Sequence, residues 1–159
     1  MVPPDEYEFI CRRVPIVCVD LLPISPDGER VGLIRRGTYD GRTGHCLVGG
    51  AIHRRERLRD ALDRHVVSSL GPTMCISDDS LSFVGVFEYF PDDRDGDLFD
   101  PRKHAVALTY TAIVEGTPEP RGEATGFAWF DRSSLPPPAA FGFGQHRVAI
   151  AALDTWSMP

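Results

Sequence analysis

The stretch from Leu47 to Pro72, LVGGAIHRRERLRDALDRHVVSSLGP, constrains the fold of this chain more than any other part of the sequence. Its apolar start and two glycines predict a strand that leads into an arginine-rich loop. Apolar residues then recur every three to four positions, which is typical of a helix with one buried face. They are Leu58, Ala61, Leu62, Val66 and Leu70. Gly71 and Pro72 end this helix, because glycine accepts the left-handed cap and proline cannot continue.

The spacing of four residues in this stretch resembles the Nudix box, G-x5-E-x7-R-E-U-x-E-E-x-G-U, in which U is aliphatic. The matching residues are Gly50, Glu56, Arg64 and Gly71. In Nudix hydrolases, glutamates on the helix bind magnesium beside a diphosphate. The corresponding positions here hold His65, Ser68 and Ser69, and Pro72 replaces the final aliphatic residue. Magnesium prefers anionic oxygen ligands, and a serine hydroxyl supplies no charge. The frame of the motif is present, while most of its chemistry is missing.

Length and charge limit the classes of protein that this chain can belong to. With 159 residues we expect one domain over residues 1–159. A net charge of −6 argues against general nucleic-acid binding. No apolar run approaches a membrane span, and the N-terminus lacks the apolar core of a signal peptide, so we expect a cytoplasmic protein. The four cysteines form no CxxC pair and are predicted to be small buried residues.

The remaining segments predict a sheet and two further helices. Prolines followed by acidic residues predict a short helix over residues 4–13, and apolar periodicity predicts another over 145–156. Residues 91–100 are expected to form a solvated acidic loop. Predicted strands cover residues 15–24, 30–36, 45–48, 81–90, 104–114 and 125–130. We therefore predict an α/β (α+β) sandwich with a mixed sheet. Within the first strand Asp20 stands out, because a buried carboxylate needs a partner, a pocket or a proton.

The element order is similar to the Nudix fold, and the segments around the box are similar to the GDP-mannose mannosyl hydrolase branch of that superfamily. The similar segments are PIVCVDLLPI, LIRRGT and VFEYFPDDRDGDLFDPRKHAVAL. This resemblance implies a homodimer that uses Mg²⁺ to hydrolyse the sugar C–O bond of a nucleotide sugar. Ser69 stands where that branch keeps a metal-binding glutamate, and Ala124 where it has a histidine base. Loss of such a base removes about two to four orders of magnitude in rate.

The resemblance also implies roles for individual residues. Asp20, His104 and Glu123 are the candidate catalytic residues. Gly50, Glu56 and Glu123 are the candidate metal ligands, of which Glu56 pairs in Nudix proteins with the arginine at the position of Arg64. Arg36 is expected to bind the substrate.

The loop after Gly50 adds Arg54 and Arg55 as candidate phosphate ligands, because guanidinium groups and a helix N-terminus both favour anions. A solvated charged face explains the same arginines. Two functions follow. The first is a divergent hydrolase that acts on a nucleoside diphosphate compound, such as a nucleotide sugar, with Mg²⁺. The second is a non-catalytic Nudix-fold module that binds or senses nucleotides without metal. A structural subunit of a dimer is the third and least favoured reading.

Overall fold

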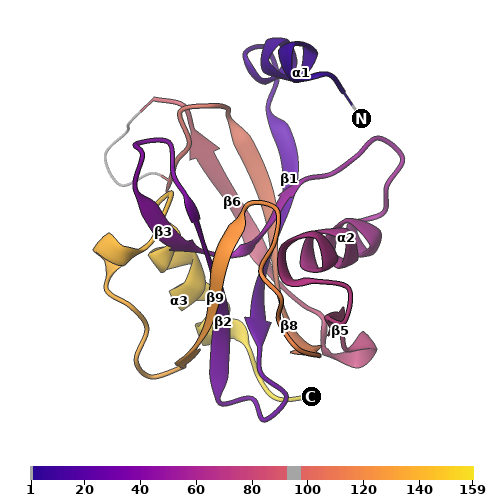
Figure 1. The fold of residues 1–159 in the computed structure, drawn as a ribbon, viewed down its shortest axis with the longest axis vertical. Helices are drawn as coiled ribbons and strands as arrows, with labels where there is room; N and C mark the ends of the chain where they lie inside the picture. Colours follow the sequence, from indigo (N-terminus) through magenta and orange to yellow (C-terminus); the bar gives the residue numbers. More distant parts are fainter. Residues whose placement is uncertain (1, 93–97) are drawn as a thin grey trace.

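The fold is a mixed sheet with three helices around it (Figure 1). The computed structural model describes residues 2–92 and 98–159. In this part of the chain the helices are α1 (Pro4–Cys11), α2 (Leu58–Leu70) and α3 (His146–Thr155). The strands are β1 (Ile16–Ile24), β2 (Arg30–Gly37), β3 (Thr43–Cys46), β4 (Val48–Ala51), β5 (Cys75–Ile76), β6 (Ser82–Phe90), β7 (Leu98–Phe99), β8 (Ala105–Glu115) and β9 (Ala124–Asp131).

Strand β1 is the centre of the sheet. It pairs in parallel with β8 along its whole length and antiparallel with β4 and, at its end, β2. The strand order is β3-β2-β1-β8-β6-β7, and β9 pairs with β2. Residues 18–25, which include most of β1 and the residue after it, are buried. This fits the strand predicted over residues 15–24, because a run of apolar residues is typical of a strand that is covered on both faces. Asp20 is therefore in the interior of the sheet.

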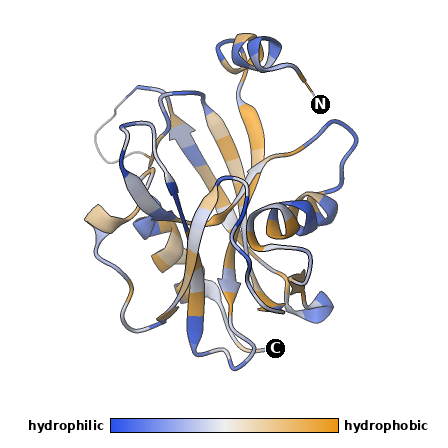
Figure 2. Cartoon of the chain, in the orientation of Figure 1, coloured by the Kyte–Doolittle hydropathy of each residue, from blue (hydrophilic) through white to orange (hydrophobic). Residues whose placement is uncertain are grey.

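Helices α2 and α3 flank the strands on either side in the view of Figure 1, and α1 extends away from the body of the molecule. Helix α2 buries the apolar face of the predicted stripe, including Ala61, Leu62, Val66 and Leu70. It stops at Gly71, which has a positive φ of 99°, as expected for a glycine stop. The following linker closes the helix end, because the amide nitrogens of Glu119 and Arg121 donate to carbonyl oxygens in its last turn. In Figure 2 the apolar colours gather on the strands between the helices.

The structure corrects three local predictions. The strand predicted over residues 45–48 is two short strands, β3 and β4, which pair with different neighbours. The acidic loop predicted over 91–100 contains β7, which pairs with the end of β6, and residues 93–97 lie outside the described part. Cys75 is exposed, whereas Cys11, Cys18 and Cys46 are buried as predicted. In the described part of the chain, no helix is both long enough and apolar enough to span a membrane.

Gly49 lies directly against the buried carboxyl group of Asp20. It lies opposite Asp20 in the β1–β4 ladder. A Cβ atom at Gly49 would lie 2.2 Å from the carbonyl oxygen of Val19 and 2.3 Å from Oδ1 of Asp20. Only glycine leaves room for this approach.

We predict that Gly49→Ala lowers the free energy of unfolding by about 1–3 kcal/mol, because the methyl group forces a shift in β1 or in the Asp20 side chain. Urea denaturation followed by circular dichroism measures the loss. Gly37→Ala is the matched control, since a Cβ there meets no atom within 4 Å, and it should change stability by less than about 0.5 kcal/mol. Equal stability of the two variants would contradict the close approach.

Candidate functional site

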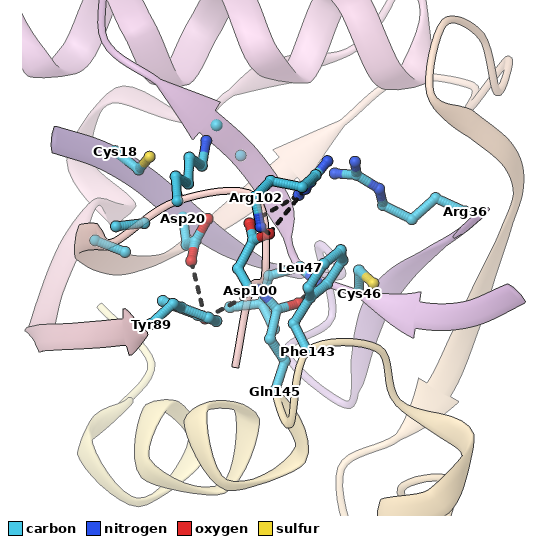
Figure 3. A pocket seen from close by; sticks show the side chains of 15 residues that line it. Cys18, Asp20, Arg36, Cys46, Leu47, Tyr89, Asp100, Arg102, Phe143 and Gln145 are labelled. Atoms are coloured by element: carbon cyan, nitrogen blue, oxygen red, sulfur yellow. Dashed lines mark hydrogen bonds and ion pairs between the residues drawn. The ribbon is translucent and has the colours of Figure 1, made fainter. Parts of the chain in front are cut away.

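A pocket with a cavity of about 70 Å³ surrounds Asp20, and we call it the Asp20 pocket (Figure 3). Residues from β1, β2, β4, β6 and β8 meet there with the segments before β8 and before α3. The lining residues are Cys18, Asp20, Arg36, Cys46, Leu47, Gly49, Gly50, Tyr89, Asp100, Arg102, Lys103, Ala105, Ala107, Phe143 and Gln145. Because β1 and β8 run in parallel, the start of β8 lies beside the start of β1, which brings residues 100–103 to the pocket.

The surroundings of Asp20 raise the pKa of its carboxyl group. It is 7% exposed, and burial raises its pKa to about 6, against the hydrogen bond from Tyr89, which lowers the pKa. A buried group with a shifted pKa in a pocket is a candidate functional residue. Asp20 therefore exists as both acid and carboxylate near neutral pH.

A buried chain of hydrogen bonds orients Asp20. The backbone amide of Leu47 donates to Oε1 of Gln145 at 2.9 Å. The Gln145 amide nitrogen then donates to the Tyr89 hydroxyl oxygen at 3.0 Å, and that hydroxyl donates to Oδ2 of Asp20 at 3.3 Å. The direction is fixed, because a backbone N–H only donates and a glutamine amide nitrogen only donates. The chain stabilises the carboxylate form of Asp20 and points toward it in Figure 3.

Three cationic side chains line the pocket with two carboxyl groups. Arg102 binds both carboxylate oxygens of Asp100 at 2.8 Å, and Nζ of Lys103 donates to the Tyr7 hydroxyl of α1 at 3.3 Å. The guanidinium carbons of Arg36 and Arg102 lie 5.5 and 5.1 Å from the ring centroid of Phe143. Figure 3 shows the two guanidinium groups pointing toward one another. Adjacent positive groups of this kind attract an anion.

Arg36 has unused hydrogen-bonding capacity on its buried side. One of its terminal nitrogens pairs with Glu123 at 2.8 Å, and its side chain is only 14% exposed. Its Nε is buried and has no hydrogen-bond partner among residues 2–92 and 98–159. Buried donors are nearly always satisfied in proteins, so this nitrogen is available to an acceptor from a ligand or a water molecule.

Glu56 and Arg64 form the brace that the Nudix box implies. Arg64 donates to Oε1 and Oε2 of Glu56 at 2.6 and 2.7 Å and to the carbonyl oxygen of Ala51 at 3.0 Å. Glu56 also accepts from the amide of His53 at 2.8 Å. The hydrogen bonds from Arg64 hold the pKa of Glu56 down, to about 2. This network fixes the loop between β4 and α2 against the helix.

The donors around this brace do not fit a resident magnesium ion. Both carboxylate oxygens of Glu56 accept hydrogen bonds from Arg64, and Oε2 also accepts one from the His53 amide, while Glu123 is paired with Arg36. A ring nitrogen of His65 lies 3.1 Å from the Ala51 carbonyl oxygen. Ser69 is buried and Ser68 bonds within its own helix. In the described parts of the chain, no three His, Cys, Asp or Glu side chains form a group that could hold a metal.

The structure brings together some of the predicted site residues and separates others. Asp20, Arg36 and Gly50 line the Asp20 pocket, and Glu123 contacts it through Arg36. His104 does not line it, because its ring stacks on Phe90 at 4.7 Å and faces Glu88.

The loop arginines are also outside the pocket. Arg54 and Arg55 are exposed on the loop before α2 and do not line the cavity around Asp20. The prediction named them because guanidinium groups and a helix N-terminus both favour anions. The chain leaves the sheet after Ala51, and the loop carries the two arginines away from the Asp20 pocket.

Sequence reasoning missed several residues that shape this pocket. Tyr89, Gln145 and Phe143 are distant in sequence from Asp20, and nothing in the sequence marked them as site residues. Asp100 and Arg102 lay in and beside a loop that was read as solvated. The signal that could have found Arg102 is the parallel pairing of β1 with β8, which places the residues before β8 next to the start of β1, where they line the same pocket as Asp20.

The fold and the braced box loop define the class of this protein: it has the Nudix fold. A solved structure from Jonesia denitrificans, described as a possible asymmetric diadenosine tetraphosphate (Ap4A) hydrolase, is similar over 89% of this chain and 94% of that chain, with 33% identity and a TM-score of 0.77. A MutT NUDIX hydrolase from Burkholderia pseudomallei covers 91% of this chain and all of that chain, with 23% identity and a TM-score of 0.65. The second likeness shows the fold alone.

The chain belongs to the family described as "Domain of unknown function (DUF4916)", whose profile matches residues 2–142. The low-salt glycan biosynthesis protein Agl8 of Haloferax volcanii is 32% identical to it over 114 residues, which are 72% of this chain and 69% of that protein. A relative of this chain therefore has a name that places it in glycan biosynthesis.

We predict that Asp20→Asn changes the pH dependence of stability. The pKa of Asp20 is about 6 in the folded protein and about 3.9 in an unfolded chain. Between these values the folded state keeps a proton that the unfolded state releases, so Asp20 makes the unfolding free energy fall as pH rises from about 4 to 6. The Asn variant lacks this fall, so it should gain about 3 kcal/mol relative to the wild type across the window. Urea denaturation from pH 4 to 7.5 measures it, and parallel pH curves would contradict a raised pKa.

We predict that Glu56→Gln lowers the unfolding free energy at pH 7 by about 1–3 kcal/mol, because charge-assisted hydrogen bonds to Arg64 are lost. Since the folded pKa of Glu56 is depressed, its contribution is complete above about pH 4.5 and disappears as pH falls through about 2. The two proteins should therefore converge in acid. Glu119→Gln is the control, since its pair with Arg121 is exposed and contributes little. A Glu56→Gln loss no larger than that of the control would show that the brace is unimportant.

Proposed function

We propose that the protein binds a nucleoside diphosphate compound, with the phosphates held between Arg36 and Arg102 at the Asp20 pocket. The observation that carries this proposal is the pair of guanidinium groups that converge on the Phe143 ring, together with the unpartnered buried Nε of Arg36. Phosphate oxygens match the fork of N–H donors that arginine presents. The guanidinium groups of Arg36 and Arg102, which both lie against the ring of Phe143, make a better phosphate site than the exposed arginines of the box loop.

The names of two relatives support the class of compound. Agl8 is named for glycan biosynthesis, and sugars are commonly activated for such synthesis by linkage to a nucleoside diphosphate. The Jonesia denitrificans protein is described as a possible hydrolase of diadenosine tetraphosphate, in which a phosphate chain joins two nucleosides. Both chemistries share a nucleoside attached to linked phosphates. A nucleotide sugar, the substrate class of the GDP-mannose mannosyl hydrolase branch, is our proposed ligand within this class.

Binding of this kind does not depend on a magnesium ion held by α2. The pocket supplies Arg36, Arg102 and Lys103 against Asp20 and Asp100, and Glu123 pairs with Arg36 from outside the lining, so these charges balance when all three carboxyl groups are ionised. Protonation of Asp20 leaves a net positive charge of one and should strengthen anion binding as pH falls through about 6. All of these residues come from one chain, so a homodimer, which we retain as a proposal, is not needed to complete the pocket.

A second candidate function is hydrolysis of the same compound, and one observation favours it. Asp20 has a pKa near 6 in a pocket, which suits a general base close to neutral pH. Its carboxylate would accept a proton from a water molecule whose oxygen attacks the sugar carbon that carries the diphosphate. The C–O bond between that carbon and the diphosphate would break, and the nucleoside diphosphate would leave with the bonding electrons while its phosphates remain paired with Arg36 and Arg102. This candidate uses neither His104 nor a metal ion.

We predict that nucleoside diphosphates and nucleotide sugars raise the melting temperature in EDTA as much as in millimolar magnesium. A ligand at one hundred times its Kd stabilises the folded state by about 2.7 kcal/mol, which a thermal-shift screen detects. Arg36→Gln should weaken binding about 10- to 100-fold, the range expected for lost hydrogen bonds to a charged group.

Arg35→Gln is the matched control for this variant. Arg35 is the neighbouring arginine of β2, is exposed, and bonds to Thr43 at 3.0 Å outside the pocket. It should leave the affinity unchanged. Stabilisation that requires magnesium, or equal losses from the two arginine variants, would contradict the proposal.

Product analysis of the same ligands separates binding from hydrolysis. If the wild type releases product in EDTA and Asp20→Asn abolishes release while still binding, the second candidate stands. If turnover stays at background in the wild type, the protein is a binding module.

A further inference from the structure

A second cavity, of about 120 Å³, adjoins the Asp20 pocket and shares one wall with it. It lies between the loop that joins β2 to β3 and the segment before α3, and we call it the Tyr39 cavity. Its lining residues are Thr38, Tyr39, Asp40, Arg42, Thr43, Gly44, Ala139, Phe141, Gly142, Phe143 and Gly144. Phe143 is the shared wall, because it also lines the Asp20 pocket.

Phe143 is held in place at a cost. Its φ is 56°, a left-handed conformation that costs a bulky residue free energy and that is concentrated at functional sites. The neighbouring Gly142 approaches Cys46 and Thr38 closely, since a Cβ there would lie 2.8 Å from Sγ of Cys46 and 2.9 Å from Cγ2 of Thr38. This backbone places the buried Phe143 ring beside both arginines and beside Tyr39.

The aromatic rings continue from the arginines into the Tyr39 cavity. The ring centroids of Phe143 and Tyr39 are 5.8 Å apart, and Tyr39 meets Phe99 edge-on at 5.0 Å. Tyr39 is 45% exposed, which is unusual for a ring supported by two others. The order along the surface is therefore guanidinium pair, Phe143, Tyr39. A nucleotide has the same order, with phosphates, ribose and then an aromatic base.

The loop that carries Tyr39 is already ordered by its own contacts. The Thr38 hydroxyl and the Arg42 side chain both bind the carboxylate of Asp40, and the amide of Thr38 donates to the carbonyl oxygen of Arg42 at 2.8 Å. A loop that is ordered before binding loses little entropy when a ligand arrives. An aromatic side chain on such a loop is a suitable stacking surface, because every nucleobase has a π-face.

We propose that the Tyr39 cavity is a nucleobase subsite, in which the base of the bound compound stacks on Tyr39 while its phosphates lie between Arg36 and Arg102. This inference rests on the proposed function, and it adds where the nucleoside lies. The alternative reading is that Tyr39 only closes the loop over the sheet. The two readings differ in which part of the ligand responds to a change at Tyr39.

The experiment compares inorganic diphosphate with ADP, GDP, UDP and CDP by isothermal titration calorimetry in EDTA. Tyr39→Leu should weaken binding of the nucleoside diphosphates about 5- to 100-fold, the range expected for loss of one base–aromatic stack. Its affinity for inorganic diphosphate should stay within about twofold of the wild type, because that probe has no base. Tyr39→Trp, which keeps a stacking ring, should retain nucleotide affinity.

Phe83→Leu is the matched control, since it removes a 53% exposed aromatic ring on β6 and should change neither affinity. Equal weakening of diphosphate and nucleotides by Tyr39→Leu, or no weakening of either, would overturn the subsite. If the wild type binds inorganic diphosphate as tightly as it binds every nucleoside diphosphate, the subsite would be overturned and the proposed function would stand. Wild-type binding of neither class would overturn both.

Discussion

Arg64 fixes the loop between β4 and α2, because it binds both carboxylate oxygens of Glu56 and the carbonyl oxygen of Ala51. These bonds join the end of β4, the loop and helix α2 into one unit. A half-buried bidentate ion pair with additional backbone bonds is much stronger than an exposed pair. The position of the loop, and therefore the opening beside Gly50, depends on it. The motif has kept the residues that hold the loop and has lost those that would hold magnesium.

Because the box is structural in this account, the proposed site lies elsewhere in the fold. Parallel pairing of β1 with β8 places the segment that carries Asp100, Arg102 and Lys103 next to the start of β1, and these residues line the same pocket as Asp20. The interior of the sheet gives Asp20 its raised pKa, and the hydrogen-bond chain through Tyr89 fixes its orientation. Arg36 reaches the same place from β2. The pocket thus combines three cationic side chains with a buried acid, and no α2 side chain lines it.

The sequence predicted the local elements well and the site only in part. The helix from Leu58 to Leu70 and the glycine stop follow from periodicity and cap chemistry, which act over a few residues. Asp20 and Arg36 were found because a charge inside an apolar strand is conspicuous and because a family resemblance pointed to them. Gln145 could not be found in this way, since it contacts Leu47 across 98 residues of chain. Arg54 and Arg55 were named from the affinity of guanidinium groups and a helix N-terminus for anions, and the structure places both on an exposed loop outside the Asp20 pocket.

We propose that the box helix holds no metal ion and that phosphates bind between Arg36 and Arg102. A crystal grown with a nucleoside diphosphate and Mn²⁺, with anomalous scattering measured at the manganese edge, distinguishes the two kinds of site. We expect phosphate density beside the two guanidinium groups and no manganese peak within bonding distance of Gly50, Ala51, Glu56 or α2. A manganese peak held by those residues, with the phosphates on that side of the loop, would contradict this proposal.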